Sequence, residues 1–309
     1  MQTTLAYRDT GSALQRLSPF VMLAWTAAMV VAALLLQHPL FLAALAASTV
    51  PVVMAARVSR NWLVLMKLAA WMCLAIVLVN VIVSNEGAHV LAEAGFRLPI
   101  VGTPRITLEA LAFGGAMSMR LLVIVAAFGL LNLSVHPDDL MRAVMKLRLP
   151  YKSVLVTSLS TRFVPVLLAD AGTIADVQRS RGLEFDSGGL LKRIRSRAAL
   201  ILPLLSNSLD RAVQLAEAME SRAYGASPRR TFYRDVPMTV DDVAALVLVA
   251  GGVALVVAVR VVGIASYLYY PSLHSIAMTS QQWGLLALLC ALFLSIIALA
   301  GLRRRHTGD

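Results

Sequence analysis

Long apolar runs separated by short polar stretches dominate the chain. A helix needs about 20 apolar residues to cross the roughly 30 Å hydrocarbon layer of a bilayer. In the first long run, Pro39 follows the polar residues Gln37 and His38, which predicts a turn between two shorter spans. Six membrane-spanning helices are therefore expected, over Phe20–Leu36, Leu40–Ala56, Trp62–Val83, Leu108–Leu133, Val243–Val262 and Trp283–Leu302.

Between the fourth and fifth spans the pattern becomes amphipathic, with apolar residues three and four positions apart, as in a helix with one apolar face. A short helix is expected between Pro137 and Pro150, a second from about Lys152 to Arg181, and a third from about Ala198 to Tyr224. The apolar stripes of the two longer helices are predicted at Leu167, Ala171, Ile174 and Gln178, and at Leu205, Leu209, Ala212, Ala216 and Met219.

Proline and glycine mark bends and ends in these two longer helices. Pro165 and Pro203 lie inside them and are expected to bend each one, because proline cannot donate the backbone hydrogen bond. Gly182 and Gly225 stand in the stop positions, where glycine adopts the left-handed conformation that closes a helix.

The composition agrees with a chain that has the bilayer as its solvent. Of 309 residues, 59% are apolar and 15% charged, and the mean hydropathy is +0.75, whereas soluble domains have roughly 45–50% apolar and about 25% charged residues. An all-α polytopic membrane protein is expected, with about six transmembrane helices and two long cytoplasmic amphipathic helices. Its expected domains are residues 1–133 with four spans, 134–235 with the amphipathic helices, and 236–309 with two spans.

The distribution of charge predicts the orientation. The net charge is +11, but the basic residues fall between and after the apolar runs, as the positive-inside rule requires, so no nucleic-acid partner is expected. The Gln37–Pro39 turn has no Lys or Arg, the connection 263–282 has no charge, and Ser84–Thr107 is mixed. Both termini and residues 134–235, which carry 26 of the 45 charged residues, are therefore expected in the cytoplasm.

The sequence shows no catalytic, cofactor or metal motif. There is no phosphate-binding Gly-x-x-x-x-Gly-Lys-Ser/Thr loop, the five histidines lack zinc spacing, and no nucleophile elbow is present. Cys73 and Cys290 lie inside apolar runs and are expected to be small buried side chains. A non-enzymatic protein without cofactor or metal is expected.

Some small or charged residues inside the spans point to helix packing. The pairs Gly114-Gly115 and Gly251-Gly252 are expected where helices approach closely. Arg120 lies near the middle of the fourth span and is expected to face protein and pair with a carboxylate or backbone carbonyls, with contact to a substrate as the alternative. No Asp, Glu or His lies near the centre of a span, which argues against a proton- or sodium-driven carrier.

Two similar triplets end the long amphipathic helices: Ser180-Arg181-Gly182 and Ser221-Arg222-Ala223. A cation at a helix C-terminus can cap the negative end of the helix dipole. A guanidinium that projects from a helix tip can also pair with a carboxylate of another protein. Spacing alone leaves capping and docking both open.

These triplets, with their surroundings, resemble a known family. Arg179–Phe185, Leu202–Leu205 and Ala218–Gly225 followed by Arg230-Thr231 are similar to the transmembrane T components of energy-coupling factor (ECF) transporters, the family of CbiQ and EcfT. Further similar segments are Leu17–Pro19, His38–Leu40, Ile106–Glu109 and His136–Leu140, so the resemblance covers nearly the whole chain.

The resemblance implies that Arg181 and Arg222 dock into two ABC-type ATPase subunits, which bind the ATP. It also implies a membrane-embedded substrate-capture S component, which takes up a vitamin or transition-metal ion in the plasma membrane of a prokaryote. The chain departs from the family's Ala-Arg-Gly pattern by serine in both triplets and by Ala223 in the second. These departures leave the shape of the second tip in question.

Two other functions are compatible with a polytopic membrane protein. A self-sufficient secondary carrier or channel, with a regulatory cytoplasmic helical segment, would transport without partner chains. An integral-membrane enzyme acting on lipid would need a cluster of His, Asp or Glu that the sequence does not show.

Overall fold

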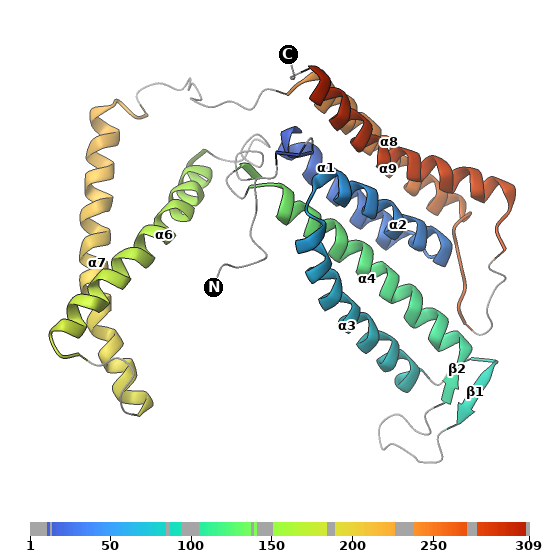
Figure 1. The fold of residues 1–309 in the computed structure, drawn as a ribbon, viewed down its shortest axis with the longest axis horizontal. Coiled ribbons are helices and arrows are strands. Elements are labelled where there is room, and N and C mark those ends of the chain that lie inside the picture. The colour runs from blue at the N-terminus through green and yellow to red at the C-terminus, as the bar shows by residue number, and fades with distance from the viewer. Residues whose placement is uncertain are drawn as a thin grey trace. The chain divides into compact units, whose positions relative to one another are not determined.

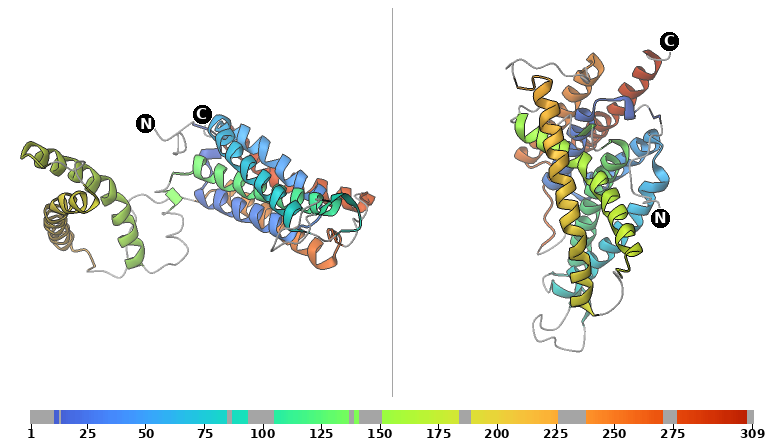
Figure 2. Two further views of the ribbon diagram at one scale, coloured as in Figure 1. Left: turned by 90° about the horizontal axis from the view of Figure 1, so that it is seen from below. Right: turned by 90° about the vertical axis from the view of Figure 1, so that its left-hand side faces the viewer.

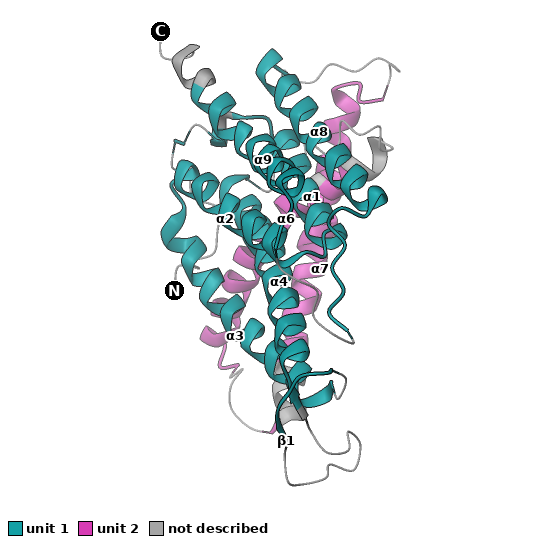
Figure 3. Cartoon of the chain, turned by 90° about the vertical axis from the view of Figure 1, so that its right-hand side faces the viewer, with its two compact units in different colours: residues 1–144, 236–309 teal, residues 145–235 magenta. Residues whose placement is uncertain are grey.

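The computed structural model describes residues 11–12, 14–84, 87–93, 105–136, 139–140, 151–183, 189–225, 238–270 and 277–306. In this part the chain is almost entirely helical (Figure 1). It divides into two compact units (Figure 3): a membrane unit, Met1–Val144 with Val236–Asp309, and an inserted unit, Met145–Asp235. Both ends of the chain thus belong to the membrane unit.

The membrane unit contains, in its described part, six α-helices, one 3-10 turn and a two-stranded hairpin. In chain order these are η1 (Leu14–Arg16), α1 (Pro19–Leu35), α2 (Pro39–Ala56), α3 (Ser59–Val83), β1 (Val90–Glu93), β2 (Arg105–Thr107), α4 (Leu108–Ser134), α8 (Val240–Val262) and α9 (Ser280–His306).

The helices of this unit confirm an all-α polytopic membrane protein. In the described part, α2, α3, α4, α8 and α9 are long and apolar enough to cross a bilayer, and α1 is a shorter apolar helix. All six occur where the apolar runs predict them. Several begin up to three residues earlier, because their polar first turns can still form helix. In α8, for example, Thr239 and Asp242 form a capping box.

Helix α1 lies at the centre of the membrane unit. It packs against α4 and α8, and eight of its 17 residues are buried, among them Val21, Met22, Trp25 and Met29. Trp25 is fully buried, and its indole Nε1 donates a hydrogen bond to the carbonyl oxygen of Phe293 in α9 at 3.1 Å. The first helix is therefore packed against α8 and hydrogen-bonded to α9.

A buried carboxylate joins the start of α1 to the start of α8. Asp242 Oδ1 accepts from the backbone N–H of Ser18 at 2.9 Å. Its Oδ2 accepts from the backbone N–H and the hydroxyl of Thr239, at 3.1 and 2.8 Å. Because burying a carboxylate is costly unless its lone pairs are used, these bonds fix the register of α1 against α8.

Helices α3 and α4 form the closest pair in the unit. A Cβ on Gly114 would lie 3.2 Å from the Cα of Val77, so this glycine allows the two backbones to approach. Ser118 Oγ donates to the carbonyl of Cys73 at 3.1 Å, and Cys73 Sγ donates back to the carbonyl of Ser118 at 3.4 Å. The outer face of α3 is apolar and exposed, as a lipid-facing surface requires; Trp71, for example, is 74% exposed.

A short hairpin precedes α4 and was not expected from the sequence. Strands β1 and β2 are antiparallel, with Val90 opposite Thr107 and a bulge beyond that pair. The fully buried Glu109, in the first turn of α4, accepts from the backbone N–H of His89 at 3.2 Å and contacts its Nδ1 at 2.8 Å. The hairpin is thereby fastened to the N-terminus of α4.

The inserted unit contains two long helices, α6 (Tyr151–Ser180) and α7 (Leu190–Ser221), which cross each other (Figures 1 and 2). Arg211 Nη2 donates to Asp170 Oδ2 at 2.9 Å, which links α7 to α6. The short helix predicted between Pro137 and Pro150 lies outside the described residues, apart from residues 139–140.

Helix α7 begins eight residues before the predicted start at Ala198. Gly189 is its N-cap, and the basic run Lys192–Arg197, which precedes the predicted start, forms its first turns. The physical reason is that leucine, lysine and arginine are all good helix formers, and no breaker follows Gly189.

The predicted apolar stripe of α7 is mostly exposed. Four of its five positions are exposed, and Met219 is half-buried. The half-buried positions lie one residue earlier, at Leu204, Ser208, Arg211 and Leu215. In α6 the predicted positions Ala171, Ile174 and Gln178 are half-buried, whereas Leu167 is exposed.

Candidate functional site

Helix α6 ends in a left-handed closure built around Arg181. Gly182 has φ +87°, and its N–H bonds the carbonyl of Arg179 at 2.9 Å. The N–H of Leu183 then reaches back to the carbonyl of Gln178 at 3.0 Å. This pair of bonds is the Schellman motif, with Arg181 as the C-cap residue.

Helix α7 ends in the same way, although it lacks the glycine. Ala223 has φ +54°, and its N–H bonds the carbonyl of Glu220 at 2.8 Å. The N–H of Tyr224 bonds the carbonyl of Met219 at 2.9 Å, which again makes Arg222 the C-cap residue of a Schellman motif. Ala223, and not the predicted Gly225, is therefore the closing residue. Gly225 follows with φ +95°.

The serine of each triplet turns back onto its own helix. Ser180 Oγ donates to the carbonyl of Val177 at 2.8 Å, and Ser221 Oγ donates to the carbonyl of Ala218 at 3.1 Å. Both bonds join residue i to residue i−3. Because the two hydroxyls are used within the helix, serine presents nearly the same outer surface as the alanine of the family pattern.

The two guanidinium groups are exposed at the helix tips. Among the described residues, neither Arg181 nor Arg222 has a side-chain hydrogen bond or ion pair. The neighbouring Arg179, in contrast, pairs with Asp176 at 2.9 Å. The carbonyls of Gln178 and Arg179 at one tip, and of Met219 and Glu220 at the other, already accept from backbone N–H groups. Neither guanidinium bonds a carbonyl among the described residues, so hydrogen-bonded capping does not account for the two side chains.

The two tips lie far apart. Helix α7 has 32 residues, which is a length of about 48 Å at 1.5 Å per residue. It begins within ten residues of Arg181 and carries Arg222 at its far end, so the tips lie at opposite ends of the crossed pair (Figure 1). They cannot form one pocket.

Pro165 and Pro203 lie inside α6 and α7, as predicted. Each removes one backbone N–H from the helical ladder. Helix α6 is visibly bent along its length in Figure 2.

Arg120 lies in the middle of α4 and bonds the end of α1. Its Nε donates to the carbonyl of Ala33 at 2.8 Å, and its Nη2 donates to the carbonyl of Leu36 at 3.1 Å. The remaining bond runs from Nη1 to the sulfur of Met117 at 3.2 Å. Backbone carbonyls, rather than a carboxylate, therefore hold this arginine within the described part of the chain.

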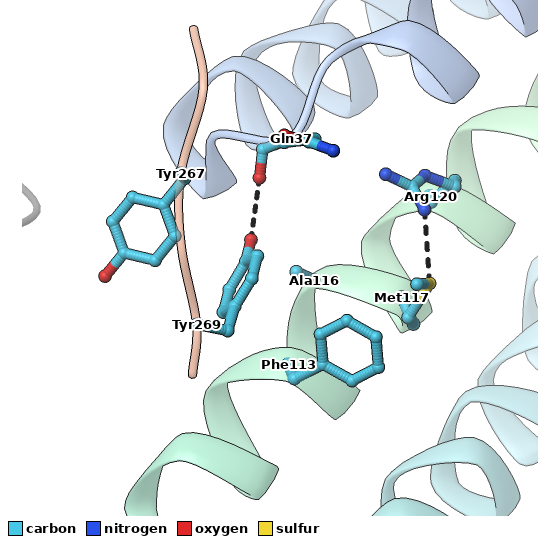
Figure 4. Close-up of a pocket in the computed structure, with 7 residues that line it drawn as sticks. All are labelled: Gln37, Phe113, Ala116, Met117, Arg120, Tyr267 and Tyr269. Atoms are coloured by element: carbon cyan, nitrogen blue, oxygen red, sulfur yellow. Dashed lines mark hydrogen bonds between the residues drawn. The ribbon is translucent and has the colours of Figure 1, made fainter. Parts of the chain in front are cut away.

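A cavity of about 100 Å³ lies beside Arg120 (Figure 4). Tyr269, from the connection after α8, donates its hydroxyl to the carbonyl of Gln37 at 2.7 Å. Burial raises the pKa of Tyr269 to about 12, assisted by Tyr267 and opposed by the charge of Arg120. The full lining is Gln37, Phe113, Ala116, Met117, Arg120, Tyr267 and Tyr269.

Sequence reasoning missed this cavity. The available signal was the aromatic run Tyr267-Leu-Tyr-Tyr270 in an uncharged connection. No group of three or more His, Cys, Asp or Glu that could hold a metal ion occurs among the described residues.

Comparison with known proteins supplies the family. A family model described as cobalt transport protein (CbiQ) matches residues 10–233, well over half of the chain. A protein of Heliobacterium modesticaldum named energy-coupling factor transporter transmembrane protein EcfT is 36% identical over 171 residues, 53% of this chain and 64% of that protein.

Relatives of the same name occur in other bacteria. That of Thermosediminibacter oceani is 34% identical over 155 residues, 48% of this chain and 58% of that protein. That of Bacillus subtilis is 29% identical over 208 residues, 64% and 76% of the two chains. The match thus spans less than two thirds of the length of the first two relatives. The extent of the family match and the shared name lead to one conclusion: the chain belongs to the CbiQ family of transmembrane (T) components of energy-coupling factor transporters.

Proposed function

We propose that this chain couples ATP hydrolysis in two partner ABC-type ATPase subunits to substrate uptake through a membrane-embedded S component. Arg181 and Arg222 each dock on one ATPase subunit and pair with acidic residues there. The chain itself neither binds nor cleaves ATP. The crossed helices pass the closing and opening of the ATPase pair to the S component, which then releases its substrate on the inner side.

The main support for this proposal is that the C-terminal ends of α6 and α7, at Arg181 and Arg222, have the same structure. Two helices in one unit end in the same Schellman closure, each with an exposed arginine at the C-cap. A guanidinium without a described partner is a strong ligand for a carboxylate, because its planar fork can form two parallel hydrogen bonds. Two such tips at opposite ends of the crossed helices fit equivalent acidic binding sites on two ATPase subunits.

An exposed apolar stripe on α7 supports contact with a further membrane partner. Its members are large aliphatic side chains, and Leu202 is 78% exposed. Contiguous exposed apolar surface of this kind marks interaction sites. We assign it to the S component. The stripe consists of Ile201, Leu202, Leu205, Leu209 and Val213.

The location and cargo follow the family. The chain lies in the plasma membrane of a prokaryote with both termini and the inserted unit in the cytoplasm, as the distribution of Lys and Arg indicates. The cargo is a vitamin or a transition-metal ion, chosen by the S component.

The test is the double variant Arg181→Glu, Arg222→Glu in the assembled transporter. Reversal of both charges replaces attraction by repulsion, and truncating or reversing one side of a charged interface pair costs about 2–5 kcal/mol. The ATPase subunits should no longer co-purify with the chain, and uptake should fall to background, while the amount of chain in the membrane stays constant.

The matched control is Arg179→Glu, which changes an exposed arginine two residues from Arg181 whose partner is Asp176. It should retain the ATPase subunits. Undiminished co-purification and uptake in the double variant would refute the docking role. Transport by the purified chain alone in liposomes would instead support a self-sufficient carrier or channel.

A further inference from the structure

We propose that the cavity beside Arg120 is a binding site for an oxyanion, a phosphate or carboxylate group that completes the coordination of this intramembrane arginine. The inference is independent of ATPase docking, because every residue that lines the cavity belongs to the membrane unit.

The first argument is charge. A cation inside a membrane helix is costly and pairs with an opposite charge or with backbone carbonyls. The two carbonyls that Arg120 bonds supply dipoles but no full negative charge. Arg120 has no ion pair among the described residues. The tyrosine hydroxyl at the cavity cannot supply the missing charge, because Tyr269 has a pKa of about 12 and stays protonated at neutral pH.

Helix dipoles do not supply the missing charge either. The C-terminus of α1 places about half a negative charge near the guanidinium, and the N-terminus of α2, four positions further on, places about half a positive charge there. The two contributions roughly cancel. The cavity therefore has a net charge close to that of the guanidinium itself.

The second argument is hydrogen bonding. A guanidinium has five N–H donors. Two donate to the carbonyls of Ala33 and Leu36, and a third contacts the sulfur of Met117. A thioether is only a weak acceptor. The third donor, and the two without a described acceptor, would gain from an anionic oxygen.

The third argument is the shape and lining of the cavity. About 100 Å³ is the volume of roughly three waters at 30 Å³ each, enough for one carboxylate or phosphate group. Phe113 and Tyr269 form two of its walls, with ring centroids 5.5 Å apart. Aromatic edges carry partial positive charge and tolerate an anion. No Asp or Glu is among the lining residues.

Gln37 connects the cavity to a second arginine. Its Oε1 accepts from Arg260 Nη1 at 3.0 Å, and its side chain lies over the cavity in Figure 4. An anion bound by Arg120 would therefore sit between α4, the α1–α2 turn and the connection after α8. Its expected effect is to hold these three segments together.

The experiment measures the thermal midpoint of the full-length chain in nonionic detergent. Three additions are compared at constant ionic strength: phosphatidylglycerol, phosphatidylcholine and inorganic phosphate. The midpoint should rise with phosphatidylglycerol or inorganic phosphate and not with phosphatidylcholine. A rise with the lipid alone identifies a headgroup site, and a rise with both identifies a site open to free anions.

Two variants test the assignment to this cavity. Arg120→Gln should weaken the apparent anion affinity about tenfold or more, as loss of charge-assisted hydrogen bonds predicts. Gln37→Glu supplies a carboxylate from within while keeping the acceptor for Arg260. It should raise the midpoint without additive and abolish any further rise.

Arg60→Gln, which removes an exposed charge elsewhere, should respond like the unaltered chain. Two results would overturn the site: no anion-dependent rise in the unaltered chain, or an unchanged rise in Gln37→Glu. Because Gln37→Glu is expected to stabilise the fold, the test holds even if Arg120→Gln fails to fold.

Discussion

An alanine holds a left-handed backbone conformation at the end of α7, where α6 has a glycine. Ala223 has φ +54° and Gly182 has φ +87°. The left-handed region costs an L-residue roughly 1–2 kcal/mol, because its Cβ crowds the following carbonyl oxygen, whereas glycine enters it freely. The two helix ends have the same geometry, but at the end of α7 the left-handed backbone conformation of Ala223 is strained.

Exchanging these two residues should therefore have opposite effects at the two tips. Ala223→Gly should stabilise the closure of α7 by about 1 kcal/mol, and Gly182→Ala should destabilise that of α6 by about as much. The measurement is amide hydrogen exchange at Tyr224 and Leu183, whose N–H groups form the long Schellman bonds. Exchange should slow about fivefold at Tyr224 and quicken about fivefold at Leu183. A change of the same sign at both would show that strain at the closing residue does not control the tips.

At the scale of residues, the sequence predicted positions better than contacts. The triplets correctly placed both arginines at helix ends, because arginine followed by a small residue is typical of a C-terminus. The closing residue of α7 was predicted at Gly225, two residues after the observed Ala223. The sequence gives no sign that an alanine will adopt the left-handed conformation. The carbonyls of Ala33 and Leu36 that hold Arg120 lie more than 80 residues earlier in the chain, and only the fold brings them together.

At the scale of elements, the packing of α3 on α4 depends on which glycine of a pair faces the neighbour. A Cβ on Gly114 would lie 3.2 Å from the backbone of Val77, whereas one on Gly115 would have nothing within 4 Å. The sequence predicted close packing for the pair as a whole. The division between the two residues follows from the rotation of α4 about its axis.

Gly114→Ala should lower the stability of the membrane unit by about 1 kcal/mol or more, because the added methyl must push two backbones apart. Gly115→Ala should leave it unchanged or raise it by up to about 1 kcal/mol, because alanine loses less backbone entropy in a helix. Thermal unfolding of the two variants in the same detergent compares them directly. Equal effects would show that this contact does not limit the approach of the helices.

The sequence predicted which segments are helical better than it predicted the residue at which each helix begins. The apolar runs located the five helices of membrane-spanning length and the shorter α1, because long runs of apolar residues have few other stable forms. The start of α7 was missed because the basic run Lys192–Arg197 lacks the apolar spacing that predicts a helix. The hairpin before α4 was missed because its first strand has only four residues and depends on the contact between His89 and Glu109.

At the scale of the whole molecule, one carboxylate joins two segments that are distant in sequence. Asp242 accepts three hydrogen bonds, one of them from Ser18, 224 positions earlier. It ties α8, which follows the inserted unit, to α1, which precedes it. This contact joins the two parts of the membrane unit that the inserted unit separates in the sequence.

Asp242→Asn should destabilise the membrane unit by about 1.5–3 kcal/mol, because an amide nitrogen would replace an acceptor that faces N–H or O–H donors. Asp241→Asn removes the same charge from the same helix N-terminus without any described side-chain bond, and should change stability by less than about 0.5 kcal/mol. Thermal unfolding of both variants at neutral pH is the measurement. If the two lose equal stability, helix-dipole electrostatics and not the buried hydrogen bonds explain the loss.

The architecture of the molecule as a whole was predicted more fully than its interior. Composition and apolar run length identified a polytopic membrane protein, and the shift to amphipathic spacing identified the inserted helices. The sequence did not show that α1 is more buried than α3, because an apolar run alone does not separate a buried helix from a lipid-facing one. Burial by α4 and α8 is a property of the assembled fold.

The contacts of α1 with the last helices also affect synthesis of the chain. The indole of Trp25 cannot form its hydrogen bond until Phe293, 268 residues later in the chain, has been made. At about 5–20 residues per second, the ribosome needs on the order of 10 to 50 seconds to supply it. Throughout that interval α1 lies in the bilayer without the helix that carries Phe293, and for most of it without α8. During this time the nascent chain is exposed to proteolysis and to non-native pairing with other helices. Its yield should therefore depend on membrane chaperones that protect the unpaired face of α1.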